Sequence, residues 1–229
     1  VYALDAEAGE TMWRLTARAT FELPAVAVRD RVVACGGPPG GRDARLFCAD
    51  LASGRLRWVE PLDVGVIGPA VGAAQTVAVI PCRDEKRGSL LVGVDLDSGK
   101  ERFRTWLDGW GAFALLGVDE DVVVCGAGGR LCSVNARDGS VRWNRLFERE
   151  SNDDVPRRLE PVLRGGALFV PADTVYVISP RDGSVIHRLR GEGLVPDLLR
   201  VDERAGIYVA EESGYLAAYG VAARLAVVK

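Results

Sequence analysis

Apolar residues occur along this chain in short runs that turn residues separate, and the pattern predicts β-strands. Residues 21–28 and 31–35 form one pair of such runs, split at 29–30, and residues 111–118 and 121–125 form another. The runs are rich in Val and are bounded by Gly and Asp, which favours strands over helices. None approaches the ~20 consecutive apolar residues that a membrane-spanning helix needs.

A segment of similar sequence occurs five times, which indicates an internal repeat. The five segments cover residues 1–13, 46–58, 91–103, 131–143 and 175–187. Each contains a glycine at the same place, and these are Gly9, Gly54, Gly99, Gly139 and Gly183. Successive glycines are 45, 45, 40 and 44 residues apart. This period is typical of a four-stranded repeat unit.

The residues at fixed distances from each glycine have physical reasons to be there. The glycine supplies the positive φ that a tight turn needs. Four residues earlier stands an acceptor for N–H groups inside the turn, which is Asp5, Asp50, Asp95, Asn135 or Ser179. Four residues later stands a large ring that we expect to pack against the neighbouring unit. The rings are Trp13, Trp58, Phe103, Trp143 and His187.

Each period therefore holds four antiparallel strands, A to D, which is one blade of a β-propeller. The predicted fold is all-β, a single β-propeller domain over residues 1–229 with about five and a half blades. The expected units are a half blade at 1–16, blades at 17–60, 61–105, 106–146 and 147–190, and an eroded terminal blade at 191–229. Because Val1 lies within a repeat, we expect the natural ring to be larger and its missing part to lie upstream.

Composition and charge narrow the function classes. Hydrophobic residues make up 48% of the 229 residues, which is typical of a globular chain. The 29 basic and 32 acidic residues nearly balance, so no overall charge attracts nucleic acid or an anionic membrane. With one histidine and no CxxC spacing, a Cys/His zinc site is not expected.

The cysteines permit two interpretations. If the B–C hairpins close symmetrically, Cys35 faces Cys48 and Cys125 faces Cys132, which would give two cross-strand disulfides. Alternatively, all are free thiols that fill small buried positions. We favour free thiols, because Phe169 and Tyr176 fill the matching pair of positions in the fifth blade, which indicates that the site needs apolar side chains. Free thiols in turn favour a reducing compartment.

The pattern Tyr/Phe-x-x-Asp-x-x-(Ala/Ser/Asp)-Gly-x-x-x-Trp resembles the PQQ-type β-propeller repeat, and the resemblance covers essentially the whole chain. In that family the ring is the blade-to-blade docking motif. One branch comprises quinoprotein dehydrogenases that bind pyrroloquinoline quinone and calcium on the propeller axis. The other is non-catalytic and includes the lipoprotein scaffold of the bacterial outer-membrane barrel assembly machine and propellers fused to signalling proteins.

The sequence departs from the dehydrogenase branch, which carries an adjacent Cys–Cys pair that is missing here. We therefore expect no catalytic residue, no cofactor and no metal. His187 has two interpretations, a general base or a substituted docking ring. Its alignment with four aromatic rings favours the docking ring.

The B–C and D–A loops of a propeller emerge on one face, which we call the loop-rich face. Trp106 and Trp110 lie there outside the docking position, and Arg157 and Arg158 lie in a long D–A insertion. These residue types are enriched at interaction hot spots. The alternative is that the two tryptophans only cap the fourth blade and that the charged loops are solvated tips.

We expect a non-enzymatic scaffold that binds a protein or peptide partner through the loop-rich face and does not bind nucleic acid. Two alternatives remain open at this point: a fragment of a PQQ- and calcium-dependent dehydrogenase, and a ligand-sensing propeller attached to a signalling protein. A small-molecule ligand therefore also remains open. Free cysteines favour a bacterial cytoplasm, whereas the resemblance also suits the periplasm or envelope.

Overall fold

The computed structural model describes residues 1–37, 43–110, 113–126, 129–147, 161–172, 174–189, 198–202, 206–210 and 214–219. These residues form 22 strands in six separate antiparallel sheets. Within the same ranges, no helix has the length and hydropathy of a membrane span. The predicted all-β class is confirmed.

The first two sheets come from the N-terminal quarter of the chain. Sheet 1 has two strands, β1 (Tyr2–Leu4) and β2 (Thr11–Arg14). Sheet 2 has four, in the order β3 (Val26–Val28), β4 (Arg31–Gly36), β5 (Arg45–Asp50) and β6 (Leu56–Pro61). Val28 pairs with Arg31 in sheet 2, so the turn between strands A and B lies at residues 29–30 as expected.

Sheet 3 contains a first strand in two pieces. Its strands are β7 (Gly65–Val66), β8 (Val71–Ala73), β9 (Val77–Asp84), β10 (Gly88–Asp95) and β11 (Glu101–Leu107). Both β7 and β8 pair with β9. Gly68 and Pro69 lie between the two pieces, and a proline cannot donate a ladder hydrogen bond.

The last three sheets follow in chain order. Sheet 4 consists of β12 (Phe113–Val118), β13 (Asp121–Gly126), β14 (Arg130–Asn135) and β15 (Val141–Leu146). Sheet 5 consists of β16 (Val162–Arg164), β17 (Ala167–Pro171), β18 (Val175–Ile178) and β19 (Val185–Arg188). Sheet 6 consists of β20 (Leu198–Val201), β21 (Ile207–Ala210) and β22 (Leu216–Tyr219). Residues 220–229, where the four-strand repeat would place the last strand of this unit, lie outside the described residues.

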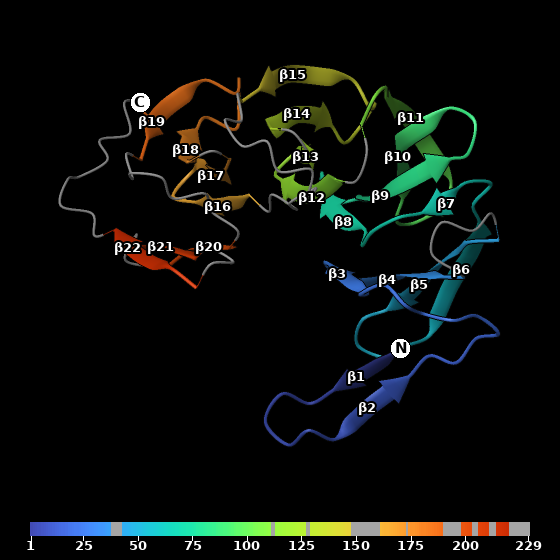
Figure 1. Cartoon of the computed structure of the whole chain (residues 1–229). Coiled ribbons are helices and arrows are strands. Elements are labelled where there is room, and N and C mark those ends of the chain that lie inside the picture. The colour runs from blue at the N-terminus through green and yellow to red at the C-terminus, as the bar shows by residue number, and fades with distance from the viewer. Residues whose placement is uncertain are drawn as a thin grey trace.

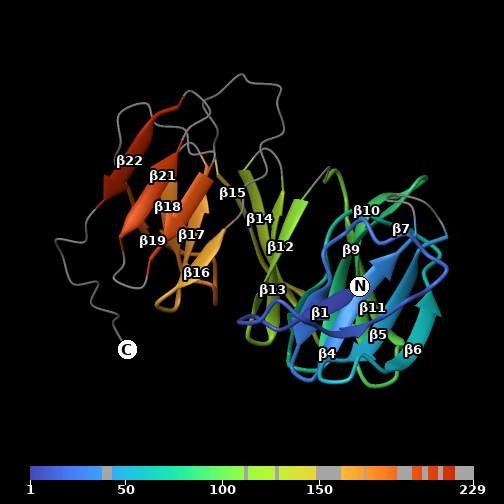
Figure 2. The same cartoon turned by 90° about the horizontal axis from the view of Figure 1, so that it is seen from below.

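The six sheets follow one another along an arc, with the inner strands β3, β8 and β12 towards its centre (Figure 1). The described residues leave the arc open between β20–β22 and β1–β2 (Figures 1 and 2). Closure of a ring is therefore not part of the observed fold.

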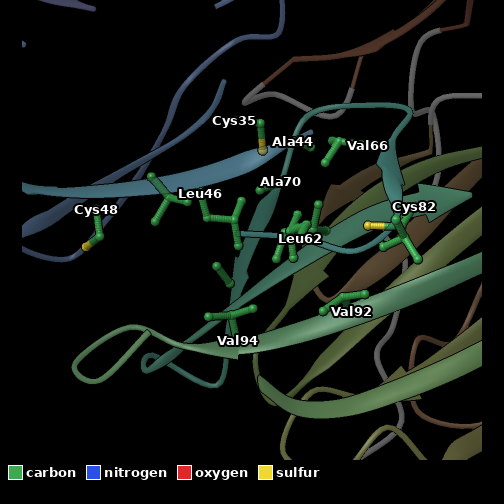
Figure 3. Close-up of a cluster of buried hydrophobic side chains, with 14 of the residues drawn as sticks. Cys35, Ala44, Leu46, Cys48, Leu62, Val66, Ala70, Cys82, Val92 and Val94 are labelled. Carbon is green, nitrogen blue, oxygen red and sulfur yellow. The ribbon is translucent and has the colours of Figure 1, made fainter. Parts of the chain in front are cut away.

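Apolar side chains between neighbouring sheets form the core. The cluster between sheets 2 and 3 contains Leu46, Cys48, Cys82, Val92 and Val94 among its buried residues (Figure 3). Similar clusters join sheets 3 and 4, 4 and 5, and 5 and 6. Sheets 2 to 5 thus bury both faces mainly against their neighbours along the arc.

The cysteines are all free and buried, which confirms the free-thiol interpretation. Both disulfide pairings are wrong, because the hairpin registers differ from the symmetric ones. Cys35 lies opposite Leu46 and Cys125 lies opposite Leu131. Cys132 is therefore one position out of register with Cys125, and it points to the opposite face of the sheet. Burial raises the pKa of the Cys132 thiol to about 12.

Candidate functional site

The turn between strands C and D has the same construction in sheets 1 to 5, where the structure describes it. In sheet 2 the Gly54 N–H donates to the Asp50 carbonyl at 2.8 Å. The Asp50 carboxylate accepts the N–H and the hydroxyl of Ser53 at 3.0 and 2.9 Å. Sheets 1 and 3 repeat the carboxylate-capped turn at Asp5 and Asp95. The chain therefore presents a glycine in the same conformation at the same end of successive sheets.

The docking rings contact this turn in the following sheet. The indole N–H of Trp13 donates to the Leu51 carbonyl at 2.9 Å, and that of Trp58 donates to the Leu96 carbonyl at 2.9 Å. Trp143 does the same with Pro180 at 2.9 Å. Each accepting residue directly follows the residue that opens the turn.

The turn glycine has a second role that the sequence interpretation missed. A Cβ added at Gly54 would lie 2.5 Å from Cδ2 of Trp13, and one at Gly183 would lie 2.7 Å from Cε3 of Trp143. Such a distance is too short for a carbon–carbon contact, so the flat face of each ring needs a residue without a side chain. The sequence signal was present, because each of the four later glycines follows a ring of the preceding unit at a nearly constant spacing.

Phe103 occupies the ring position without an N–H donor. It is buried, and a Cβ at Gly139 would lie 2.5 Å from its Cδ2. The missing donor is supplied from two residues further along β11, because the Thr105 hydroxyl donates to the Gly139 carbonyl at 2.6 Å. The contact between sheets 3 and 4 therefore keeps both its ring and a hydrogen bond.

His187 differs from the other four ring positions. It lies on β19, all of whose residues are exposed, and its ring makes no hydrogen bond with any residue that the structure describes. The turn that would follow β22 lies beyond the described ranges.

The residue that accepts the indole also holds its own sheet together. The N–H groups of Leu51 and Leu96 donate at 2.9 Å to the carbonyls of Asp30 and Thr76, which lie in the A–B turns of the same sheets. Ala136 donates in the same way to Glu120 at 2.9 Å. One peptide segment thus links the two turns of a sheet and, in sheets 2 and 3, receives the neighbouring ring.

Trp106 and Trp110 lie on opposite sides of sheet 3, near the loop-rich face. Trp106 is half-buried and packs against the cluster between sheets 2 and 3, and the Arg87 guanidinium lies 3.9 Å from its ring centroid. Trp110 is half-buried against the cluster between sheets 3 and 4, with an edge-on contact to Phe113 at 6.4 Å between centroids. Both rings close the ends of apolar clusters and keep part of their surface exposed.

Two further contacts tie this region to the strands. The Ser89 hydroxyl donates to the Trp110 carbonyl at 2.8 Å, and Arg130 donates to the Gly109 carbonyl at 3.3 Å. Arg157 and Arg158 lie outside the described residues.

A shallow cavity of about 460 Å³ lies between the inner strands β3, β8 and β12. Most of its lining is aliphatic or glycine, and its ionic or amide side chains are Arg29, Gln75 and Asp119. No aromatic ring lines it that could stack on a quinone, and Asp119 is its single carboxylate. Among the residues that the structure describes, no three His, Cys, Asp or Glu side chains gather as metal ligands would. The cavity between β3, β8 and β12 therefore does not fit a quinone with a bound cation.

Comparison with protein families gives a match to the family described as outer membrane protein assembly factor BamB, over residues 1–86 and 67–193. A search of curated proteins finds no match.

Among solved structures, BamB from Moraxella catarrhalis is similar with a TM-score of 0.69 and 16% sequence identity, covering 93% of this chain and 65% of that one. A europium-containing methanol dehydrogenase is similar with a TM-score of 0.57 and 12% identity, covering 82% of this chain and 46% of that one. The chain thus spans less than two thirds of the length of these relatives. At such identities the likeness concerns the fold.

Proposed function

Because the chain belongs to the family of the outer membrane protein assembly factor BamB, built from PQQ-type propeller repeats, we propose that it is a non-catalytic scaffold. In this proposal it binds a protein or peptide partner through its loop-rich face. The ring-docked sheets hold the loops in fixed positions, and the loops determine which partner binds.

One observation carries the proposal, namely the half-exposed Trp106 with Arg87 stacked on it. The ring belongs to β11, where Trp106 pairs with Leu90, and Arg87 belongs to the turn that precedes β10. An aromatic ring and a guanidinium held by a rigid ladder lose little conformational entropy on binding. Residues of these two types also dominate the binding energy of many interfaces.

The titratable groups of the described residues agree with a role in binding. Burial raises the pKa of the Cys82 and Cys125 thiols well above the ordinary value, so neither is a ready nucleophile at neutral pH. The single imidazole belongs to His187, which is exposed on an outer strand. No carboxylate of the described residues forms an ion pair with this ring, as an orienting partner of a general base would.

Site-specific photo-crosslinking tests the proposal. A crosslinking amino acid replaces Arg130 on the loop-rich face or, as a matched control, the exposed Asp97 in a C–D turn at the opposite end of a sheet. In cells of the source organism we expect Arg130 to give a discrete protein adduct that Asp97 does not give. The adduct should weaken when Arg87→Ala and Trp106→Ala are combined. Equal adducts from both positions would contradict binding through this face.

A fragment of a quinoprotein dehydrogenase is the second candidate, because the methanol dehydrogenase shares the fold with a TM-score of 0.57. The test is to incubate the full-length protein with pyrroloquinoline quinone and calcium and to measure dye reduction with alcohols and sugars. The scaffold proposal predicts no turnover above a protein-free control. Robust turnover would replace it with the dehydrogenase.

A further inference from the structure

The cavity between β3, β8 and β12 has three hydrogen-bonding side chains at its rim. Arg29, Gln75 and Asp119 stand in the A–B turns of sheets 2, 3 and 4, at the end of the sheets opposite the loop-rich face. All three residues are exposed, and none of their side chains forms a hydrogen bond or an ion pair with a described residue. A cation, an amide and an anion are therefore available to a molecule that enters the cavity.

The neighbouring charges in these turns are already paired. Asp30 and Glu120 directly follow Arg29 and Asp119, and each forms an ion pair with an arginine of the protein. The guanidinium and the carboxylate that remain without such a pair are the two that line the cavity. The charge pattern of the rim thus favours a ligand that carries both a negative and a positive group.

The backbone holds the three rim residues in an uncommon conformation. Arg29, Gln75 and Asp119 have φ angles of +55°, +57° and +50°, in a region that residues with a side chain seldom adopt. Sheet 5 builds the same turn from Gly165 and Gly166, with φ angles of +56° and +76° and no such cost. Backbone strain of this kind clusters at binding sites, where it fixes the direction of a side chain.

The wall of the cavity presents backbone groups more than side chains. The strands β3, β8 and β12 each pair on one edge only, so alternate N–H and C=O groups of the other edge point towards the centre of the arc (Figure 1). A Cβ at Gly72 would lie 2.5 Å from Cγ2 of Val28, and one at Gly117 would lie 2.2 Å from the Gly72 carbonyl oxygen. These close contacts hold the three inner strands at a fixed spacing.

We propose that this cavity binds a short peptide with free termini, of two or three residues. The Arg29 guanidinium donates to the carboxylate of the peptide, and the Asp119 carboxylate accepts from its ammonium group. Gln75 and the free strand edges pair with the peptide groups between the termini, and small aliphatic side chains lie on the valines of β3 and β8. The site is separate from the loop-rich face, so the scaffold proposal does not depend on it.

Charge and size favour such a peptide over other small ligands. Phosphate or another simple anion would meet the Asp119 carboxylate in the same cavity as Arg29. A metal ion would find one carboxylate and a guanidinium. The volume of about 460 Å³ lies in the usual range for small organic ligands and exceeds what a single amino acid fills.

NMR titration with L-alanyl-L-alanine tests the proposal. We expect saturable shifts at the amides of Ala27, Gly72 and Gly117, with a Kd of about 1 mM or tighter. Acetylating the amino group of the dipeptide should weaken binding roughly tenfold in the wild type but less than about twofold in Asp119→Asn. Amidating its carboxylate should show the same relation to Arg29→Ala.

Arg29→Gly separates binding from folding. Glycine relieves the positive φ, so the variant should have a higher Tm and yet bind the dipeptide at least roughly tenfold more weakly. The matched control is Arg55→Gly, because Arg55 is exposed in the C–D turn of sheet 2 and has no positive φ. It should lower Tm slightly and leave the affinity unchanged.

Three outcomes would overturn the proposal. One is the absence of saturable shifts at the three cavity amides up to about 10 mM dipeptide. Another is an equal loss of affinity in Arg29→Gly and Arg55→Gly. The third is a doubly blocked dipeptide that binds as tightly as the free one, because the two rim charges would then recognise nothing.

Discussion

The interface between sheets 2 and 3 and the interface between sheets 5 and 6 come from the same repeat. They differ in the residue at the ring position and in how far that residue is buried. At the first, Trp58 lies on Gly99, donates to Leu96 and covers the end of a large buried cluster. At the second, a smaller apolar cluster joins the sheets, and His187 stays exposed at the ring position. Among the described residues, apolar burial joins sheets 5 and 6, while at sheets 2 and 3 the ring adds a directional contact that fixes their relative position.

The largest expected contrast is between Trp143→Ala and His187→Ala. Trp143 is 7% exposed and donates to Pro180, so its loss should reduce the free energy of unfolding by about 3–5 kcal/mol. His187→Ala should change it by less than about 0.5 kcal/mol, because its side chain is exposed. Urea denaturation measures both. Similar losses for the two variants would show that the docked tryptophan and the exposed histidine contribute equally to stability, which would contradict the comparison.

Gly183→Ala tests the same contact from the side of the turn on which the Trp143 ring lies. The added Cβ would lie 2.7 Å from the Trp143 ring, in a backbone with a φ of +69°. We expect a loss of about 2–4 kcal/mol from the strain and the clash together. Gly166→Ala, with a φ of +76° and nothing within 4 Å, is the control and should lose only roughly 1 kcal/mol. Thermal or urea unfolding of the pair would show whether the ring, and not φ alone, requires the glycine.

Trp58→Phe isolates the hydrogen bond from the ring. The variant keeps an aromatic ring above Gly99 but leaves the Leu96 carbonyl without the indole donor. We expect a loss of about 1 kcal/mol in the free energy of unfolding. The control is Trp110→Phe, since the Trp110 indole donates to no described residue. If both variants lose equally, the effect reflects ring size and the hydrogen bond contributes nothing.

The smallest effect concerns the aspartate carboxylates that accept hydrogen bonds within the C–D turns of sheets 2 and 3. In sheet 5 the same position is Ser179. Burial alone would raise the pKa of Asp95, but hydrogen bonds from Ser98 and Arg102 lower it to about 2. A carboxyl whose pKa is lower in the folded chain stabilises it above pH ~4, and this contribution is lost as the pH falls from there to about 2. The stability difference between the wild type and Asp95→Asn should therefore shrink over that range. Urea midpoints measured at a series of pH values test this, and a constant difference would contradict it.

Much of the fold was predictable because the repeat carries several independent signals. The A–B turns expected at 29–30 and 119–120 are observed, with Val28 opposite Arg31 and Val118 opposite Asp121. Two-residue turns between apolar runs leave little freedom in register. The C–D turns followed equally from the spacing of acceptor, glycine and ring.

Other features depended on information that a single chain's pattern does not carry. The cysteine registers depend on the geometry of longer B–C loops, where a shift of one residue moves a side chain to the other face. The contact of each glycine with a ring crosses between units, so neither unit reveals it alone. Thr105 substitutes for the missing indole donor only because β11 brings its hydroxyl to the Gly139 carbonyl.

The central claim is that ring and glycine act as one docking unit between adjacent sheets, which keeps the loop-rich face rigid. The most direct measurement is a double-mutant cycle with Trp143→Ala and Gly183→Ala, using the free energy of unfolding. Once the ring is gone, the new methyl group meets open space, so the second substitution should be milder by about 1–2 kcal/mol than in the wild type. Losses that add within about 0.5 kcal/mol would show that the two residues act independently and would contradict the docking unit.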